Sequence, residues 1–288
     1  MKLCLLGKTG LLGTEFFKLF KKKGFDFISP SSKELNLLDT KKVKEYMEKE
    51  TPDQIILCVA YTNIDLAEKE KELCEALNVK LVKTLLRFNI PIVHFSSDYV
   101  FSAPENMKIP EDFELNPLNF YGKTKQNAEM LIEKSILAGN THWNIRTSWL
   151  FGTSSKNFVS TILKLSKSNT TLKIIDDQIG RPTFAKDLAK AVIKHFIETP
   201  FPAGNYHLQN TGNPISWAGF ATYFLKQELG NSAPQIEKVS SSQWKNLNFP
   251  KVIANRPKNS VLKNTKLPES MRNWKIAVDE YLASIQNK

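Results

Sequence analysis

A glycine-rich turn near the N-terminus constrains the fold of this chain more than any other feature. Gly7-Lys8-Thr9-Gly10-Leu11-Leu12-Gly13 follows an apolar run, Lys2–Leu6, and opens an amphipathic stretch, Leu11–Lys23. At such a junction of strand and helix, Gly7 permits a tight turn and Gly10 lets the backbone approach a pyrophosphate at the positive helix end. Gly13 allows the helix to pack closely on the sheet. A Walker loop ends in Gly-Lys-Ser/Thr, whereas here Gly7-Lys8-Thr9 stands at the start of the turn and no such tripeptide closes it. The turn is therefore not a Walker loop. All seven residues of the turn are therefore predicted to bind a dinucleotide.

Short β-rich runs alternate with helical patterns through the first half of the chain. This alternation is typical of a parallel sheet wound in both directions. We expect strands at Lys2–Leu6, Asp26–Ser29, Gln54–Val59, Ile92–Phe95 and His142–Thr147, and helices at Leu11–Lys23, Thr40–Glu50, Glu70–Phe88 and Asn119–Ala138.

The alternation loosens after Trp149. Helical patterns at Asn157–Ser168, Phe184–Glu198 and Ser216–Leu229 are separated by connections rich in Gly, Pro and Asn. The predicted fold class is α/β, a Rossmann-type doubly wound parallel sheet with a smaller C-terminal substrate-binding lobe. Residues 1–149 would form the cofactor-binding Rossmann domain. Residues 150–288 would form mainly the substrate-binding lobe, with some segments returning to the Rossmann domain.

Composition excludes several classes of protein. No apolar run approaches the roughly 20 residues that cross a bilayer, so we expect no membrane segment. The three cysteines, Cys4, Cys58 and Cys74, lie in apolar surroundings, which favours reduced thiols and a cytoplasmic location. The net charge of +11 comes largely from scattered lysines. We therefore predict a solvated surface that helps to attract an anionic small molecule, and no binding of nucleic acid.

The second expected strand bears on the choice of cofactor. NAD-selective sites place an Asp or Glu at the end of this strand, to bind the ribose 2′-hydroxyl. Here the segment reads Ile28-Ser29-Pro30-Ser31-Ser32-Lys33, and Asp26 lies at the other end of the strand. Ser29 and Lys33 could instead bind a 2′-phosphate, so NADPH is the predicted cofactor, with tolerance for NADH. Asp39 could contact the adenine edge or cap the following helix.

Tyr121 and Lys125 form the second informative pattern. Four residues apart on a helix, they share one face. A cation held there would lower the phenol pKa and let the phenol pass a proton near neutral pH. With seven tyrosines in a lysine-rich chain, about one Tyr-x-x-x-Lys is expected by chance. Its position downstream of a dinucleotide turn makes it informative.

Several blocks of sequence together resemble the dTDP-4-dehydrorhamnose reductase family of extended short-chain dehydrogenases/reductases. Their order and spacing follow the family nearly from end to end. The blocks are Gly7–Gly13, Cys58–Asp65, Ser96-Ser97-Asp98-Tyr99-Val100-Phe101, Asn116–Lys125, Arg146-Thr147-Ser148-Trp149, Asp177–Thr183, Gly204–Leu208 and Arg256–Ser260.

The resemblance implies that hydride from a nicotinamide reduces the 4-keto group of a nucleotide-linked 6-deoxyhexose. It assigns proton donation to Tyr121, contact with the nicotinamide ribose to Lys125, and a hydrogen bond to the ketone oxygen to Ser97. It also implies cofactor contacts from Ala60, Tyr61 and Thr62, and substrate contacts from Ser97, Asp98, Tyr121, Trp149, Arg181 and Arg256.

Some of these residues have a structural alternative. Trp149 could be a core residue at the lobe junction, and Arg256 could belong to a structural ion pair. Asn78 could complete a proton relay or be an amide on a helix surface. His94 and His207 lie inside expected strands, which favours core or edge roles.

The resemblance also raises the question of a metal. Some family members form a homodimer bridged by a metal through glutamates. Glu15 matches one such position, but Lys186 stands where another acid is expected. This departure puts the metal-bridged dimer in doubt and leaves a homodimer open. Mg²⁺ is not expected to be catalytic.

The sequence bears on three alternative functions. Tyr99 stands where sugar-nucleotide dehydratases carry a Glu, which argues against dehydration. A sister reductase or epimerase acting on another sugar nucleotide, for example one giving 6-deoxytalose, stays open. So does a non-catalytic NADP-binding regulatory subunit, although Tyr121, Lys125 and Ser97 are all retained.

Overall fold

The computed structural model describes residues 1–251 and 253–286. Its centre is a six-stranded sheet with the order β10-β5-β4-β3-β1-β2, in which every neighbouring pair is parallel. The strand order reverses beside β1, since β2 lies on one side of it and β3 on the other. Ligands of doubly wound sheets bind at such a point. The strands are β1 Lys2–Leu6, β2 Asp26–Ile28, β3 Gln54–Leu57, β4 Ile92–Ser97, β5 His142–Thr147 and β10 Gly204–His207.

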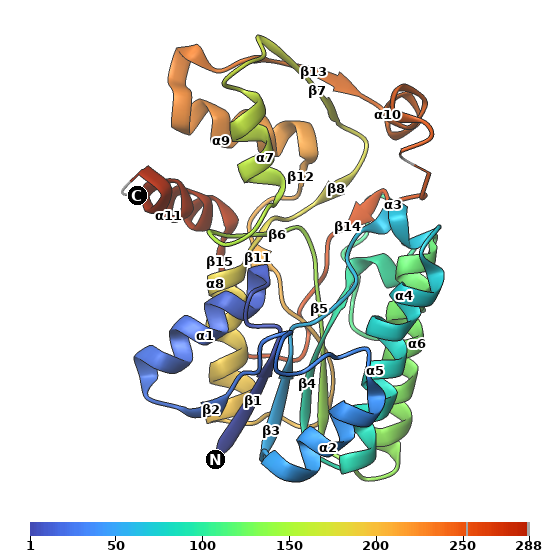
Figure 1. Cartoon of the computed structure of the whole chain (residues 1–288). Coiled ribbons are helices and arrows are strands. Elements are labelled where there is room, and N and C mark those ends of the chain that lie inside the picture. Colours follow the sequence, from blue (N-terminus) through green and yellow to red (C-terminus); the bar gives the residue numbers. More distant parts are fainter. Residues whose placement is uncertain (252, 287–288) are drawn as a thin grey trace.

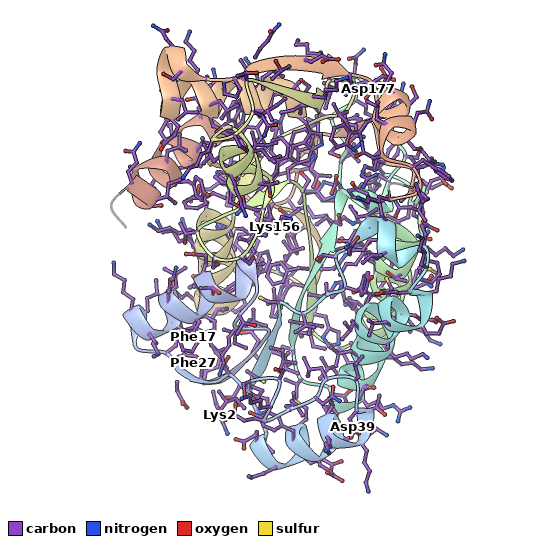
Figure 2. All side chains as sticks on the ribbon, turned by 45° about the horizontal axis from the view of Figure 1, so that its top comes forward. Lys2, Phe17, Phe27, Asp39, Lys156 and Asp177 are labelled. Atoms are coloured by element: carbon purple, nitrogen blue, oxygen red, sulfur yellow. The ribbon has the colours of Figure 1, made fainter. Side chains whose placement is uncertain are left out.

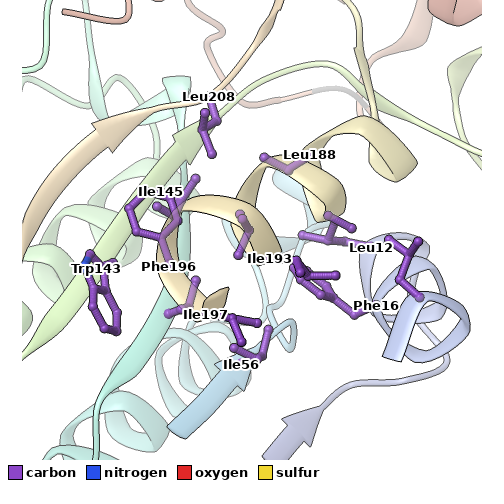
Figure 3. Close-up of a cluster of buried hydrophobic side chains, with 14 of the residues drawn as sticks. Leu12, Phe16, Ile56, Trp143, Ile145, Leu188, Ile193, Phe196, Ile197 and Leu208 are labelled. Atoms are coloured by element: carbon purple, nitrogen blue, oxygen red, sulfur yellow. The ribbon is translucent and has the colours of Figure 1, made fainter. Parts of the chain in front are cut away.

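Helices cover both faces of this sheet (Figure 1). On one face lie α1 (Leu11–Lys23) and α8 (Ala185–Val192), the latter continued by the π-helical η4 (Ile193–Glu198). Their apolar side chains enclose a core with the sheet, in which Phe16, Leu188 and Ile193 lie over the strands (Figure 3). The other face is covered by α2 (Thr40–Glu50), α5 (Leu81–Leu85) and α6 (Phe120–Leu137).

The long helix predicted over Glu70–Phe88 is helical but not uniform. It consists of α4 (Lys71–Glu75), the π-helical η1 (Ala76–Lys80), α5 and the 3-10 turn η2 (Leu86–Phe88). A short α3 (Ile64–Ala67) precedes it. Isolated π turns often occur at functional sites, and this one carries the buried Asn78.

Most other predicted elements differ from the structure only at their ends. β4 continues two residues beyond the predicted Phe95, because Ser96 and Ser97 still pair with β5. β2 and β3 end at Ile28 and Leu57, earlier than predicted. At the sheet edge, Phe17 of α1 packs edge-on against Phe27 of β2, with ring centroids 5.6 Å apart (Figure 2).

A second lobe lies over the carboxyl ends of the strands (Figure 1). It has an aromatic core of its own, in which Phe151, Phe184 and Phe220 pack with Trp274. Its helices are α7 Phe158–Leu165, α9 Trp217–Leu229, α10 Ser241–Asn248 and α11 Trp274–Gln286. Its strand pairs are β6 Leu150–Phe151 with β9 Thr183–Phe184, β7 Thr171–Ile175 with β13 Gln235–Val239, β11 Asn210–Thr211 with β15 Met271–Asn273, and β8 Ile179–Gly180 between β12 Ile215–Ser216 and β14 Asn259–Ser260. Two 3-10 turns, η3 Asp98–Val100 and η5 Gly230–Ser232, complete the fold.

The chain passes between the sheet with its covering helices and the second lobe more than once. α8, η4 and β10 belong to the sheet layer although they follow residue 149. The division into domains at residues 1–149 and 150–288 stays a prediction. Among the described residues, no helix has both the length and the apolar character needed to cross a membrane.

Candidate active site

The glycine-rich turn adopts a backbone that other residues could not follow. Gly7 has a φ of 95°, in the left-handed region, and its carbonyl accepts a hydrogen bond from the Gly10 amide at 3.1 Å. A Cβ on Gly13 would lie 2.0 Å from the Gly7 oxygen, so only glycine fits there. Gly10 caps α1 with no side-chain hydrogen bond, which leaves the first amides of the helix to an outside acceptor. Leu11 and Leu12 turn their side chains toward the protein interior, so only their backbone could serve a ligand.

A cleft of about 330 Å³ opens beside this turn. Gly7, Lys8 and Thr9 line one side and the segment after β2, including Ser31 and Ser32, lines the other. Lys8 reaches the end of β2, where its ammonium donates to the Ser29 carbonyl at 2.6 Å. The cleft therefore combines the start of a glycine turn, serine hydroxyls and a cation next to the N-terminus of α1, a donor set that fits the phosphates of a dinucleotide.

Other predicted cofactor residues lie less directly in this cleft. The Ser29 hydroxyl donates to the Leu5 carbonyl at 3.1 Å, inside the sheet edge. Lys33 is exposed and is not part of the cleft wall. Asp39 caps α2, because its carboxylate accepts from the amides of Lys41 and Lys42 at 3.1 Å each. Capping was one of the two roles left open for Asp39, and its cofactor contact stays a prediction.

Asn78 holds the loop after β3 in place. Its carbonyl accepts from the Tyr61 amide at 2.8 Å, and its amide group donates to the Tyr61 carbonyl at 3.2 Å and to Thr124 Oγ1 at 2.9 Å. Asn78 is 1% exposed, so the alternative of a helix-surface amide is wrong. It ties the Ala60-Tyr61-Thr62 loop to α6, beside Lys125.

Tyr121 and Lys125 lie on the inner face of α6 and are both buried. Asn119 caps this helix by accepting from the Gly122 amide at 2.8 Å. A Cβ on Gly122 would lie 2.2 Å from the Tyr99 oxygen. The glycine thus lets the start of α6 press against η3, which continues directly from Ser97 at the end of β4.

The ionisation of this pair differs from the sequence-based prediction. The pKa of Tyr121 is raised above its ordinary value, mainly by burial, while a hydrogen bond with Ser97 acts in the lowering direction. The prediction that Lys125 lowers the pKa of the Tyr121 phenol is therefore wrong for the side chains of this chain. The Lys125 ammonium instead contacts His94 Nε2 at 3.2 Å. Burial lowers the pKa of Lys125 to about 8, with Glu129 opposing.

Asp98 connects the end of β4 to the second lobe. Its carboxylate accepts from the Ser97 hydroxyl at 2.8 Å and from the Ser260 hydroxyl on β14. Burial raises the pKa of Asp98 to about 6, while both hydroxyls oppose the shift. Asp98 is thus held between the lobes, next to the hydroxyl that faces Tyr121.

A second, larger cleft lies between the two lobes. Its larger part, about 650 Å³, and its apolar part, about 380 Å³, share Ile175, Gln178, Trp244 and Arg256. Tyr99 lines the apolar part and packs edge-on against Tyr121, with ring centroids 5.5 Å apart. The interlobe cleft therefore leads toward Tyr121. Asp177 lines it near the top of the molecule, far from Asp39 at the α2 end (Figure 2).

Comparison with known proteins places this geometry in a family. Residues 1–287 match the RmlD substrate binding domain. The chain belongs to this family. It is 35% identical to the spore coat polysaccharide biosynthesis protein SpsK of Bacillus subtilis, over 98% of this chain and 96% of that protein. It is 32% identical to dTDP-4-dehydrorhamnose reductase of Aggregatibacter actinomycetemcomitans, over 93% and 92% of the two chains.

Solved structures agree with this assignment. A dTDP-4-dehydrorhamnose reductase of Bacillus anthracis in complex with NADP superposes with a TM-score of 0.89 at 27% identity, covering 98% of this chain and 99% of the other. An orthologue from Clostridium acetobutylicum gives 0.88 at 31% identity, covering 99% and 100%. The family resemblance and the Rossmann-type fold predicted from the sequence are confirmed, and this member of the RmlD family is an oxidoreductase.

Within the RmlD fold, Trp149 lies at the lobe junction. It adopts a positive φ of 50° and stacks on Trp217, with centroids 3.5 Å apart and planes 9° from parallel. Trp217 lines the apolar part of the interlobe cleft. Trp149 thus supports a wall of that cleft, and its contact with a sugar stays a prediction.

The two predicted arginines occupy different places. Arg256 lines both parts of the interlobe cleft and forms an ion pair with Asp65 of α3. Arg181 donates to the Leu262 carbonyl at 3.1 Å and lines a separate pocket of about 180 Å³, which shares no residue with the interlobe cleft. A substrate contact of either arginine stays a prediction.

The positions considered for a metal bridge hold ordinary polar contacts. Glu15 Oε1 accepts from Lys18 at 3.2 Å and from Thr153 at 3.3 Å. Lys186 pairs with Glu280 of α11 at 2.6 Å.

Sequence reasoning missed several residues of the site. Trp244 and Gln178 line both parts of the interlobe cleft but were not predicted as ligands. His94 was expected in a core or edge role, and its contact with Lys125 was not foreseen. A titratable side chain in the middle of a buried strand was the available signal.

Proposed function

We propose that this protein is an NADPH-dependent reductase of the 4-keto group of a nucleotide-linked 6-deoxyhexose. The proposed reaction converts dTDP-4-dehydro-L-rhamnose to dTDP-L-rhamnose. The observation that carries the proposal is the hydrogen bond of Tyr121 with Ser97, next to Tyr99 of the interlobe cleft, with Lys125 buried on the same face of α6. Relatives named dTDP-4-dehydrorhamnose reductase, one of them solved with NADP, support it.

The bound nicotinamide would supply hydride to carbon 4 of the sugar. Negative charge then develops on the ketone oxygen, and the residues of this chain would neutralise it. Tyr121 would donate its phenolic proton to that oxygen, and the Ser97 hydroxyl would turn from Asp98 to donate a hydrogen bond to it. Because burial raises the pKa of Tyr121, the phenol stays protonated at neutral pH, as a proton donor requires.

The cofactor would be held mainly by backbone and cationic groups. The backbone amides of the Gly7–Gly13 turn would donate to the pyrophosphate at the start of α1. Lys8 would bind a 2′-phosphate at the end of β2. The loop Ala60-Tyr61-Thr62, fixed by Asn78, and the ammonium of Lys125 would contact the nicotinamide end. This arrangement supports a preference for NADPH over NADH.

A reductase acting on another sugar nucleotide is the second candidate. The similarity to a spore coat polysaccharide biosynthesis protein favours a role in making a surface polysaccharide but names no sugar. A regulatory subunit is less well supported, because the buried Tyr121, Lys125 and Ser97 are all present. A cytoplasmic location and a homodimer remain part of the proposal.

The deciding experiment follows loss of NADPH absorbance with dTDP-4-keto-6-deoxyglucose, with and without a 3,5-epimerase, and identifies the product by NMR. We expect turnover that depends on the epimerase and yields dTDP-L-rhamnose. A talose product would point to the sister reductase. Tight NADPH binding without turnover on any nucleotide sugar would favour the regulatory subunit.

A further inference from the structure

A row of buried polar side chains crosses three neighbouring strands behind Lys125. His94 of β4 lies directly opposite Asn144 of β5, and Asn144 lies opposite Asn205 of β10. His94 Nε2 contacts Lys125 Nζ at 3.2 Å, and His94 Nδ1 contacts Asn144 Oδ1 at 2.7 Å. Asn144 Nδ2 donates to Asn205 Oδ1 at 3.0 Å. His94, Asn144 and Lys125 are at most 2% exposed.

The row fixes the tautomer of His94. Since the amide nitrogen of Asn144 is used by Asn205, its oxygen faces the imidazole and can only accept. His94 must therefore carry its proton on Nδ1, which leaves a lone pair on Nε2 pointing at the Lys125 ammonium. The imidazole stays neutral, because burial, and next the charge of Lys125, lower the pKa of His94 well below its usual value.

The acid that could compete for Lys125 is engaged by another cation. Glu129, one turn further along α6, is the nearest acid in the sequence, but Arg146 binds its carboxylate at 2.7 Å and 3.1 Å. Besides His94, the titratable groups acting on Lys125 are Glu129 on its own helix and Cys74 on α4. Within the described part of the chain, the Lys125 ammonium makes its hydrogen-bond contact with His94.

We propose that His94 is a positioning residue for Lys125. It acts as a neutral acceptor of fixed tautomer, set by Asn144 and Asn205, that anchors one N–H of the ammonium. The other two N–H groups are then directed to the cofactor ribose and toward Tyr121. An ammonium has three donors and a flexible stem, so a single fixed acceptor strongly restricts where the other donors point. This inference rests on the proposed function only for what Lys125 contacts.

Two substitutions separate positioning from packing. His94→Leu keeps much of the volume but removes the acceptor, whereas His94→Gln places an amide oxygen near the position of Nε2. We expect His94→Leu to weaken NADPH binding and to lower kcat by roughly 10- to 100-fold, the size expected for a lost hydrogen bond to a charged group. His94→Gln should recover most of both.

His142→Leu is the matched control. His142 is also a fully buried histidine, and its ring accepts from the Ile92 amide at 3.2 Å and contacts Ser135 at 2.9 Å, away from Lys125. We expect this variant to lose stability with kcat and NADPH affinity near wild type. Equal loss of activity in His94→Leu and His142→Leu would overturn the proposal, because general destabilisation would then explain both.

The alkaline limb of the kcat profile gives a readout that packing alone would not move. Burial already lowers the pKa of Lys125 to about 8. Loss of a neutral acceptor disfavours the ammonium further, so the limb should move by about one pH unit to lower pH in His94→Leu and return in His94→Gln. An unmoved limb in His94→Leu would contradict the positioning role.

Nitrogen-15 NMR of the free protein tests the tautomer without any assay of activity. The His94 resonances, assigned by their loss in His94→Gln, should show a neutral ring protonated on Nδ1 from pH 6 to 8. A ring protonated on Nε2, or an imidazolium, would refute the inference. If the proposed reaction failed while the NMR spectrum was as expected, the His94–Lys125 contact would stand and only the proposed substrate would be rejected.

Discussion

At the scale of single residues, the site depends on the pKa values of Tyr121 and Lys125, which burial shifts, and on the hydrogen bond of Ser97. Tyr121 keeps its proton because its pKa is raised, Lys125 stays largely cationic at neutral pH although its pKa is lowered to about 8, and Ser97 donates to Asp98. The sequence-based expectation, in which the lysine makes the phenol more acidic, considered charge alone. In the protein, burial dominates and raises the pKa of Tyr121, so Tyr121 is predicted to act as an acid that gives up its proton only when charge appears on the ketone oxygen.

The first prediction concerns this proton. Tyr121→Phe removes the donor and keeps the ring that packs against Tyr99. We expect kcat to fall at least ~10²-fold, as for a lost general acid, with the melting temperature and NADPH Kd little changed. Tyr46→Phe, on α2, serves as the control and should behave as wild type in steady-state assays. Near-normal turnover by Tyr121→Phe would remove Tyr121 from the mechanism.

The second prediction concerns cofactor choice. Lys8 rather than Lys33 supplies the cation at the end of β2. Lys8→Met should weaken NADPH binding by about 10-fold or more, through loss of a charge-assisted contact, and should weaken NADH binding much less. Fluorescence titration of both cofactors measures this difference, with Lys33→Met as the matched control. Equal weakening for the two cofactors would show that Lys8 does not read the 2′-phosphate.

At the scale of elements, the glycine turn and α1 act as one unit, in which Gly10 and Gly13 have different roles. Gly13→Ala would place a Cβ 2.0 Å from the Gly7 oxygen, whereas a Cβ on Gly10 would meet the same oxygen at an ordinary 3.5 Å. We expect Gly13→Ala to destabilise the fold by about 1–3 kcal/mol or more, as overpacking does. Gly10→Ala should fold normally and lose NADPH affinity. Thermal melts with and without NADPH distinguish the two, and unchanged cofactor binding by Gly10→Ala would exclude the turn as the pyrophosphate site.

Periodicity predicted the elements well because their burial is regular. β1 and β5 were predicted to the residue, since the sheet buries most of their side chains on both faces. The π turn at Asn78 could not be predicted, because it depends on contacts with Tyr61 and Thr124 that are distant in sequence. The row His94–Asn144 was missed for the same reason, since its members become neighbours only when β4 and β5 pair.

At the scale of the whole molecule, buried histidines should make stability depend on pH. Burial lowers the pKa of His142 to about 4 and of His207 to about 3. Both stay neutral in the folded protein, while in the unfolded chain they gain a proton near pH 6.5. Their contribution is therefore complete above pH 6.5 and is lost as the pH falls toward 4. Asp98, whose pKa is raised to about 6, acts in the opposite direction. Urea unfolding should show lower stability at pH 5 than at pH 7, with a weaker dependence in His142→Gln; a flat profile would contradict the assignment.

The last prediction concerns how the two lobes share the substrate. Asp65 of α3 accepts from the amides of Ile253 and Ala254 at 2.9 Å and 3.1 Å and pairs with Arg256, while Asn119, the cap of α6, donates to the Asn255 carbonyl at 2.7 Å. Helix α6 and the wall of the interlobe cleft are thus joined through one segment, residues 253–256. The ion pair is largely buried, so its loss should matter more than that of a surface pair.

Arg256 should do more than hold this segment, because it lines both parts of the interlobe cleft. We expect Arg256→Met to raise KM for the nucleotide sugar by about 10-fold or more, as for a lost charge-assisted contact, with NADPH Kd unchanged. Asp65→Asn keeps the guanidinium and an acceptor for the amides, so its KM should rise only a few-fold. Steady-state kinetics of the two variants and their double mutant would measure the coupling. Equal effects of the single substitutions would mean that Arg256 serves the joint between the lobes and does not bind the diphosphate.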